Sequence, residues 1–381
     1  MGNDKRTYTI AMAVTNDLAT DRRVLRHAAT LREAGYAVSL VGRNEVPTSH
    51  SRGWRFYLEF NIGLRRKLLQ LSPDVVWAND TDTLLGSWLA CFSLAHTPFR
   101  KREKMRLVMD AHELFSEVPE IQDKPFVKWV WRTIESLLMP RCDALLTVCQ
   151  SVADYYSNLY SVKMAVVRNV PDNVTARIES DASVGTPDNS SSLIPASSLK
   201  TLLYQGRVNL GRGVDWAIDA LEWLPECRLV VAGDGDLLEE MKAYVADKPW
   251  RDRVMFLGRM MPDELVRLTP QADVGLVMLE DMGLNYHYAL PNRIGDFVQA
   301  GVPIVVSNLP EMAAVVRKFK VGEVIEMNKE KSEVRNCYAR ALARTVKMVL
   351  AKGREGYDFS EARKDMDWNK EKNKLLECVN A

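Results

Sequence analysis

The amino-acid sequence predicts two α/β domains, each a doubly wound, Rossmann-like parallel sheet with helices on both faces. Three observations lead to this fold class. The chain has 381 residues, which is too long for one ordinary core and fits two. Short, nearly continuous apolar runs alternate with amphipathic segments of helix length, as in a parallel sheet that is buried on both faces. This alternation stops once, between residues 173 and 199, and then starts again.

The first domain is expected over residues 1–172. Its opening strand is followed by a helix that Thr20 or Asp21 caps and Gly35 ends, because these residue types are typical of helix boundaries. Buried apolar runs predict strands at Tyr8–Val14, Ala37–Val41, Val75–Ala78, Leu107–Asp110, Ala144–Val148 and Ala165–Val167.

Residues 173–199 are rich in serine, also contain glycine, proline and small polar residues, and show no hydrophobic periodicity, so they are predicted to form a linker or mobile loop. The second domain is expected over residues 200–358. Its predicted strands are Thr201–Tyr204, Arg228–Ala232, Val254–Leu257, Val274–Met278 and Pro303–Ser307. Residues 359–381 contain a charged helix with one apolar stripe, which we expect to cross back to the N-terminal domain.

Charge and cysteine content narrow the class of protein. The chain has 51 lysines and arginines against 50 acids, so no overall field favours nucleic acid, and phosphate binding would need local clusters of cations. The six cysteines form no closely spaced metal-ligand pair and are expected to be reduced thiols of a cytosolic protein. No apolar run approaches the roughly 18 residues of a membrane-spanning helix. The first residues lack the pattern of a secretory signal, so we expect a cytoplasmic protein. Because the cysteines form no ligand pair, we also expect no bound metal.

The loop after the first strand of the second domain combines glycines with cations. It contains Gly206, Arg207, Gly211 and Arg212 ahead of a helix. Glycines let the backbone approach an anion, and guanidinium groups bind phosphate oxygens through paired hydrogen bonds. The alternative is a basic turn with solvated arginines. Ligands of doubly wound domains bind at the carboxyl ends of the strands, which favours a phosphate site here.

A second candidate anion site is the start of the helix that follows Pro291 and Asn292. Free backbone amides and the helix dipole attract an anion at such a position. Asp296 lies within the first turns, where its carboxylate could bind a ribose diol. Alternatively, Asp296 only stabilises the start of the helix.

Polar residues also follow strands of the first domain. The strand that ends at Asp110 is followed by His112, which could donate a hydrogen bond to a sugar or phosphate, and Glu113, which could act as a base. Asp80 follows another strand and could orient an acceptor hydroxyl, or only cap the next helix. Asn16 lies in the loop after the first strand.

Taken together, these segments resemble the family-four branch of the GT-B glycosyltransferases. The resemblance spans nearly the whole chain and is carried by TDRRVLRHAATLREAGYAVSLV, DVVWANDTDTLL, MDAHELFSE, YQGRVNLGRG and LPNRIGDFVQAGVPIVVS. It implies two domains that face each other across a cleft. It also implies retaining transfer of a sugar from a nucleotide diphosphate to a carbohydrate or lipid-linked acceptor, without a cofactor, in surface polysaccharide or glycoconjugate synthesis.

The resemblance also assigns roles to individual residues. It implies that Arg207 and Arg212 hold the donor diphosphate and that His112 lies near the transferred sugar. The full set expected at the site is His112, Glu113, Arg207 and Arg212 as catalytic residues, Gly206, Asp234, Gly258, Arg259, Leu290, Pro291, Asn292 and Asp296 on the donor, and Asn16 and Asp80 on the acceptor side.

The chain departs from the family in one motif. Members often carry two glutamates around the donor, and this sequence has Tyr288 and Asp296 at the corresponding positions. The shorter Asp296 can still meet a ribose diol, whereas Tyr288 excludes a mechanism that needs a carboxylate there. Two other functions stay open: a sugar-nucleotide epimerase of the same fold, and an inactive, nucleotide-binding partner of another transferase.

A last segment bears on membrane contact. Residues 125–142 hold several aromatic and aliphatic side chains, and the upstream run FRKREKMR, residues 99–106, is strongly basic. Aromatic residues beside cations suit an anionic membrane surface, provided that Phe126 or Trp131 is exposed on the same face as the cations. The other interpretation, an ordinary domain helix with Trp129 and Ile134 in the core, is favoured. Contact with the inner face of the membrane is therefore the weaker alternative.

Overall fold

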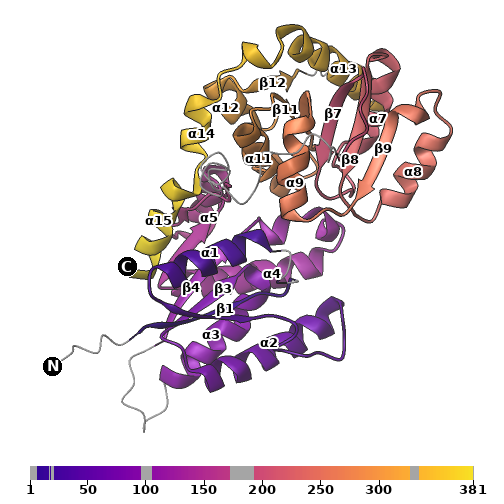
Figure 1. The fold of residues 1–381 in the computed structure, drawn as a ribbon. Coiled ribbons are helices and arrows are strands. Elements are labelled where there is room, and N and C mark those ends of the chain that lie inside the picture. The colour runs from indigo at the N-terminus through magenta and orange to yellow at the C-terminus, as the bar shows by residue number, and fades with distance from the viewer. Residues whose placement is uncertain are drawn as a thin grey trace. The chain divides into compact units, whose positions relative to one another are not determined.

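The computed structural model describes residues 7–16, 18, 21–95, 105–171, 193–326 and 334–380. The chain forms two compact units (Figure 1). Unit 1 comprises Met1–Asn169, Gly283–Asn285 and Glu371–Ala381, and unit 2 comprises Val170–Met282 and Tyr286–Lys370. Most of the predicted linker (residues 172–192) and most of the basic run (residues 99–104) lie outside the described residues.

Unit 1 is built on a parallel sheet of six strands in the order β2-β1-β3-β4-β5-β6. The strands are β1 Thr9–Ala13, β2 Ala37–Val41, β3 Val75–Asn79, β4 Arg106–Ala111, β5 Ala144–Thr147 and β6 Ala165–Val166. Each predicted strand of the first domain is present, because these apolar runs are buried between helices on the two faces of the sheet. Figure 1 shows α1 on one face of the sheet, with α2 and α3 on the other.

The helices of this half of the chain are α1 Arg22–Glu33, α2 Gly53–Leu71, α3 Thr81–Ala95, α4 Pro125–Leu138 and α5 Gln150–Tyr160. Asp21 caps α1, since its carboxylate accepts a hydrogen bond from the Val24 amide at 3.1 Å. Thr20, the other predicted cap, lies outside the described residues. The helix ends just before Gly35, which has a positive φ of 93°.

The packing of α2 against α3 depends on one close contact. A Cβ atom on Gly86 would lie 2.7 Å from the backbone oxygen of Asn61, so only glycine fits without a shift of the helices. The Asn61 amide group then accepts from the Gly86 N–H at 2.7 Å and donates to the Asp82 carbonyl at 2.8 Å. This contact fixes the first turns of α3, which follow directly on the end of β3.

Helix α4 corrects the predicted placement of its aromatic residues. Trp131 is buried, in edge contact with Tyr57 of α2, whereas Trp129 is 61% exposed and Phe126 is 72% exposed. The assignment of Trp129 to the core was wrong. The buried face of the helix is set by Trp131, Glu135 and Leu138, and Trp129 lies on the opposite face of a 3.6-residue turn.

Unit 2 is built on a second parallel sheet of six strands, in the order β12-β11-β10-β7-β8-β9. The strands are β7 Lys200–Gln205, β8 Cys227–Ala232, β9 Val254–Gly258, β10 Val274–Val277, β11 Ile304–Ser307 and β12 Gly322–Ile325. The sequence did not predict β12. It is a short edge strand that contains a glycine and Glu323, so its apolar signal is weak.

The helices of the second half of the chain are α7 Val214–Ala220, α8 Leu238–Ala246, α9 Pro262–Leu268, α10 Leu284–His287, α11 Arg293–Ala300, α12 Pro310–Phe319, α13 Val334–Lys352, α14 Ser360–Asp365 and α15 Trp368–Asn380. Single 3₁₀ turns occur at Phe115–Glu117, Pro119–Ile121, Met139–Arg141, Leu221–Trp223, Arg251–Arg253, Thr269–Gln271 and Arg354–Gly356. Residues 371–381 belong to unit 1, where Glu371 accepts hydrogen bonds from the Arg168 guanidinium at 2.7 and 2.9 Å.

Candidate functional site

A buried ion pair lies at the carboxyl end of β4. Arg23 of α1 donates from Nε and Nη2 to the two oxygens of Asp110, at 2.9 and 2.6 Å, and the two side chains are 3% and 0% exposed. Arg23 also donates from Nη1 to the Val167 carbonyl at 2.7 Å. Burial alone would raise the pKa of Asp110, but the charges of Arg23 and His112, with the hydrogen bonds from His112 and His27, together outweigh it and hold that pKa well below its usual range. Asp110 is therefore an ionised carboxylate at neutral pH.

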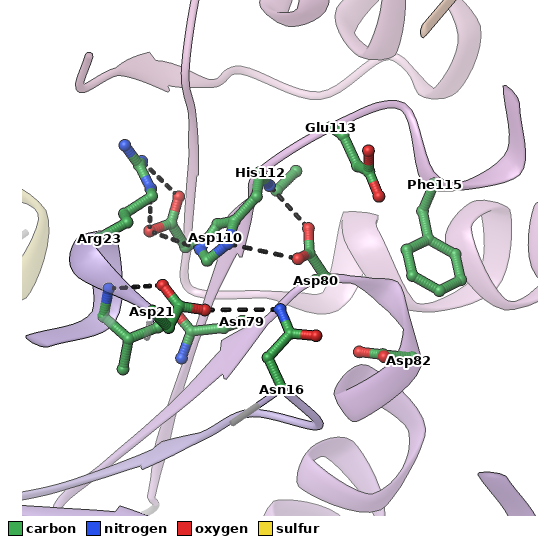
Figure 2. Close-up of polar contacts among 12 residues, drawn as sticks. Asn16, Asp21, Arg23, Asn79, Asp80, Asp82, Asp110, His112, Glu113 and Phe115 are labelled. Atoms are coloured by element: carbon green, nitrogen blue, oxygen red, sulfur yellow. Dashed lines mark hydrogen bonds and ion pairs between the residues drawn. The ribbon is translucent and has the colours of Figure 1, made fainter. Parts of the chain in front are cut away.

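His112 lies between this carboxylate and a second one (Figure 2). Its Nδ1 is 3.3 Å from Oδ2 of Asp80, and its Nε2 is 3.5 Å from Oδ2 of Asp110. Burial lowers the pKa of the imidazole, but the charges of Asp80 and Asp110, with a hydrogen bond to Asp110, outweigh this effect and raise it to about 9. Burial also raises the pKa of Asp80, to about 8, and the positive charge of His112 opposes that rise. His112 is therefore a cation at neutral pH, able to donate hydrogen bonds and unable to act as a base.

The backbone of Asp80 is strained. Its φ of 62° lies in the left-handed region, which costs a non-glycine residue roughly 1–3 kcal/mol. The conformation lets its carboxylate accept from the His112 backbone amide at 2.7 Å, while its own amide donates to the Asp110 carbonyl at 2.9 Å. Asp80 thus holds the loop after β4 through its contacts with His112.

Two more carboxylates lie near Asp80, labelled in Figure 2 as Asp82 and Glu113. Burial raises the pKa of Asp82 to about 6, and the Thr15 hydroxyl donates to its carboxylate. Glu113 is half-buried, and its Oε2 accepts from the Asn285 amide at 3.0 Å. The carboxyl end of this sheet therefore gathers several groups that accept hydrogen bonds, which suits a ligand with hydroxyl groups.

Asn16 is the predicted residue of unit 1 that does not join this cluster. Its side chain is exposed, and its amide nitrogen lies 3.5 Å from the Asp21 carboxylate, at the limit of a hydrogen bond. Its contact is with the residue that caps α1 and not with Asp80 or His112.

In unit 2, the loops after β7 and β8 pass unusually close to each other. A Cβ atom on Gly233 would lie 1.7 Å from the Gly206 carbonyl oxygen, and Gly206 has a φ of 133°. The two glycines thus leave backbone, rather than side chains, at this strand end. Arg207 follows with an exposed side chain, and the Tyr204 hydroxyl donates to its carbonyl at 2.5 Å. Arg212 is half-buried, 4.9 Å from the centre of the Tyr286 ring.

Arg293 is a cation of this region that our sequence analysis missed. It is buried, donates to the carbonyls of Gln205 and Met278 at 3.0 and 3.2 Å, and lies 4.8 Å from the centre of the Tyr204 ring. Burial, and to a lesser degree the charge of Arg212, lowers its pKa. Among the described residues no carboxylate forms an ion pair with it. The sequence did contain a signal for Arg293. A cation at the first position of a helix is unfavourable beside the helix dipole, so its presence there indicates another role.

The start of α11 provides fewer free amides than the sequence suggested. Asn292 caps the helix without a side-chain bond, but the Ile294 and Gly295 amides already donate to the carbonyls of Pro291 and Asn292. Within the described hydrogen bonds, the Asn292 and Arg293 amides are left for a ligand. Asp296 lies in the first turn, and its carboxylate accepts from the Gln205 amide at 3.4 Å.

The other residues predicted on the donor side are spread over neighbouring loops. Asp234 is exposed after β8 and accepts from the Gly235 amide at 2.8 Å. Gly258 ends β9 with a φ of 70°, and Arg259 follows with an exposed side chain. Leu290 is half-buried ahead of Pro291. These residues follow different strands of the same sheet.

The described residues contain no group of three or more His, Cys, Asp or Glu side chains arranged around a common metal position. No described helix has both the length and the apolar character needed to cross a bilayer.

Two protein-family models match the chain, one on each half. The model described as Glycosyltransferase Family 4 matches residues 20–172, and the model described as Glycosyl transferases group 1 matches residues 199–346. The two matches follow each other in the order of the two sheets.

Curated proteins and a solved structure are also similar. An uncharacterized glycosyltransferase of Methanocaldococcus jannaschii is 28% identical over 123 residues, 31% of this chain and 30% of that protein. The α-D-kanosaminyltransferase of Streptomyces kanamyceticus is 27% identical over 137 residues, 31% of this chain and 36% of that protein, so the match covers less than two thirds of either relative. A solved structure of Anabaena HepE in complex with UDP has a TM-score of 0.66 at 14% identity, over 98% of this chain and 100% of that one, a likeness in fold alone.

We predict that His112 stays protonated at neutral pH. Its pKa is raised from 6.5 to about 9, so the stability it contributes is complete below pH 6.5 and is lost as the pH rises through 9. Nuclear magnetic resonance of protein labelled with ¹⁵N-histidine measures this titration directly. Asp80→Asn removes one of the two carboxylates and should lower the pKa of His112.

His27 is an internal control in the same spectra, because burial, together with the charge of Arg23, lowers its pKa to about 4. It should stay neutral where His112 is charged. A His112 that titrates at or below 6.5 in the unmodified protein would contradict the assigned arrangement.

We also predict that Arg293→Met lowers the free energy of unfolding by about 2 kcal/mol. Two buried carbonyls lose a charged donor, each bond contributing about 1.5–3 kcal/mol, while removal of a buried cation offsets part of the loss. Urea denaturation measures the change. Arg251→Met, at an exposed arginine of the same unit, is the matched control and should change stability by less than about 0.5 kcal/mol. Equal free energies of unfolding for the two variants would show that the hydrogen bonds of Arg293 do not stabilise the fold.

Proposed function

This chain belongs to the glycosyltransferases of group 1 and family 4, and from this membership we propose that it transfers a sugar from a nucleoside diphosphate to an acceptor hydroxyl. Its two Rossmann-like domains are those of the GT-B fold. The observation that carries the proposal is the set of cations at the strand ends of unit 2. Arg207 is exposed, Arg212 is half-buried, and Arg293 is a buried charge without a carboxylate partner among the described residues.

The proposed step breaks the bond between C1 of the sugar and the phosphate oxygen and forms a bond between C1 and the acceptor oxygen. The leaving diphosphate takes the bonding electron pair, and the proton of the acceptor hydroxyl passes to a phosphate oxygen. Negative charge therefore grows on the diphosphate in the transition state. Guanidinium groups of Arg207 and Arg212 would stabilise it with charge-assisted hydrogen bonds, and the chain itself would supply no nucleophile.

Unit 1 would bind hydroxyl groups. The carboxylates of Asp80 and Glu113 accept hydrogen bonds, and the imidazolium of His112 orients Asp80 and adds positive charge beside it. Because His112 is charged at neutral pH, we propose that it donates to an oxygen and takes no proton from the acceptor. Asn16 would contribute only if the acceptor reaches the exposed loop after β1.

The finer features of the function are proposals as well. Retention of configuration at C1 is implied by the family. It fits the proposed step, in which the protein supplies no nucleophile. We propose a carbohydrate or lipid-linked acceptor, a role in surface polysaccharide or glycoconjugate synthesis, and a cytoplasmic location at the inner face of the membrane. The cytoplasmic part of this proposal is supported by the six cysteines, all free thiols in the structure.

A panel of nucleotide sugars tests the function. We expect one donor to raise the melting temperature, since a ligand at a hundredfold excess over its dissociation constant stabilises by about 2.7 kcal/mol. With that donor, release of nucleotide should depend on the acceptor. Isomerisation of the donor without acceptor would identify an epimerase, and binding without either reaction would identify an inactive partner.

Arg207→Ala is the variant for this assay, and it should lower kcat about 10- to 100-fold, because charge-assisted bonds of about 1.5–3 kcal/mol to the leaving group are lost. Arg212→Lys should have a smaller effect, since it keeps the charge and loses only the paired geometry. Arg251→Ala is the control and should keep full activity. A folded Arg207→Ala protein with unchanged turnover would remove this residue from the site.

We also predict that transfer needs no metal ion, because guanidinium groups supply the positive charge that a divalent cation would otherwise provide. Activity should be the same before and after treatment with EDTA. A metal-dependent transferase in the same buffer is the positive control for chelation. Activity that is lost with EDTA and restored by Mg²⁺ or Mn²⁺ would refute this prediction.

A further inference from the structure

Helix α2 presents a row of apolar side chains to solvent. Trp54, Leu58 and Ile62 are spaced by four residues, lie on one face of the helix and are 70%, 50% and 45% exposed. Phe56, Phe60, Leu64 and Leu68 form the opposite, buried face. The helix is therefore apolar on two faces, and its packing against the sheet accounts for only one of them. Figure 1 shows α2 beside α3 on one face of the sheet of unit 1.

The exposed row is flanked by cations. Arg55 and Arg66 are exposed, and Arg65 and Lys67 are partly exposed. In the described part of the chain none of these four forms an ion pair. The single acid of the helix, Glu59, is held by His50, at 2.6 Å.

The surface continues from α2 onto α3. Arg65 donates from Nη2 to the Ser93 hydroxyl of α3 at 2.9 Å, and the adjacent Phe92 is 47% exposed. Arg55 lies 5.4 Å from the centre of the Trp54 ring, so a cation and an aromatic side chain lie next to each other at the start of the helix. We call Trp54, Leu58, Ile62, Arg55 and Arg66 the basic apolar strip.

Helix α4 is the informative contrast. Its outer face also exposes aromatic residues, Phe126 and Trp129. However, its cations Lys128 and Arg132 are both bound to the Glu117 carboxylate, at 2.7 and 2.5 Å. The outer face of α4 therefore presents apolar side chains, but its cations are neutralised by Glu117. Helix α2 presents apolar side chains together with cations that form no ion pair among the described residues.

We propose that the basic apolar strip of α2 docks unit 1 onto an anionic membrane surface. An amphipathic helix with tryptophan and leucine on one side and arginines beside them lies in the interface, where each cation near anionic lipid contributes about a fivefold change in partitioning. A bilayer also fits the shape of the strip. A stable protein interface needs about 800 Å² on each partner, more than one row of side chains supplies.

Vesicle sedimentation with the full chain tests this proposal without any nucleotide sugar, so its outcome is independent of the proposed function. Vesicles of phosphatidylcholine with phosphatidylglycerol should carry the protein into the pellet, and vesicles of phosphatidylcholine alone should not. High salt should release the protein, because screening shortens the range of the attraction. Protein that stays in the supernatant with anionic vesicles at low salt would overturn the proposal.

Variants locate the surface. Arg55→Gln with Arg66→Gln should weaken binding to anionic vesicles about 30-fold, and Trp54→Ser with Leu58→Ser and Ile62→Ser should abolish it. Leu159→Ser, at an exposed leucine of α5, is the matched control and should bind normally. Circular dichroism confirms that each variant is folded. If Phe126→Ser with Trp129→Ser abolishes binding while the α2 variants retain it, the proposal is wrong and α4 is the docking surface.

Discussion

The buried ion pair of Arg23 and Asp110 is the interaction on which unit 1 depends. Two charges are taken out of water here, and only the paired geometry with an additional bond to the Val167 carbonyl makes this tolerable. The pair joins α1, β4 and the chain that follows β6. It also keeps Asp110 ionised, and the negative charges of Asp80 and Asp110 together raise the pKa of the neighbouring His112.

The charge on His112 in turn affects the conformation of Asp80. An imidazolium between Asp110 and Asp80 draws the Asp80 carboxylate toward it, and Asp80 adopts a left-handed backbone to meet it. Strain of this kind persists only where the surroundings over-determine the conformation. The polar groups at the end of this sheet are therefore ordered before any ligand binds, which reduces the entropy that binding would otherwise cost.

Unit 2 uses the opposite arrangement of charge. Arg293 is buried beside backbone carbonyls and an aromatic ring, with no carboxylate to neutralise it among the described residues. The close approach of Gly206 and Gly233 leaves backbone groups beside it. A protein that keeps a buried cation uncompensated gives up stability at that point, and the positive potential remains available to an anionic ligand.

The sequence by itself determined the two parallel sheets, because short apolar runs that alternate with helix-length segments form a pattern that needs no knowledge of contacts. It also located the strand-end loops that hold Arg207 and His112. It missed β12, whose short edge strand has little apolar signal, and it placed Trp129 in the core, because spacing alone does not say which face of a helix is buried. Only the tertiary structure decided the charge of His112 and the role of Arg293. Both depend on groups far away in the chain, and electrostatic effects in a buried site are set by distance in space.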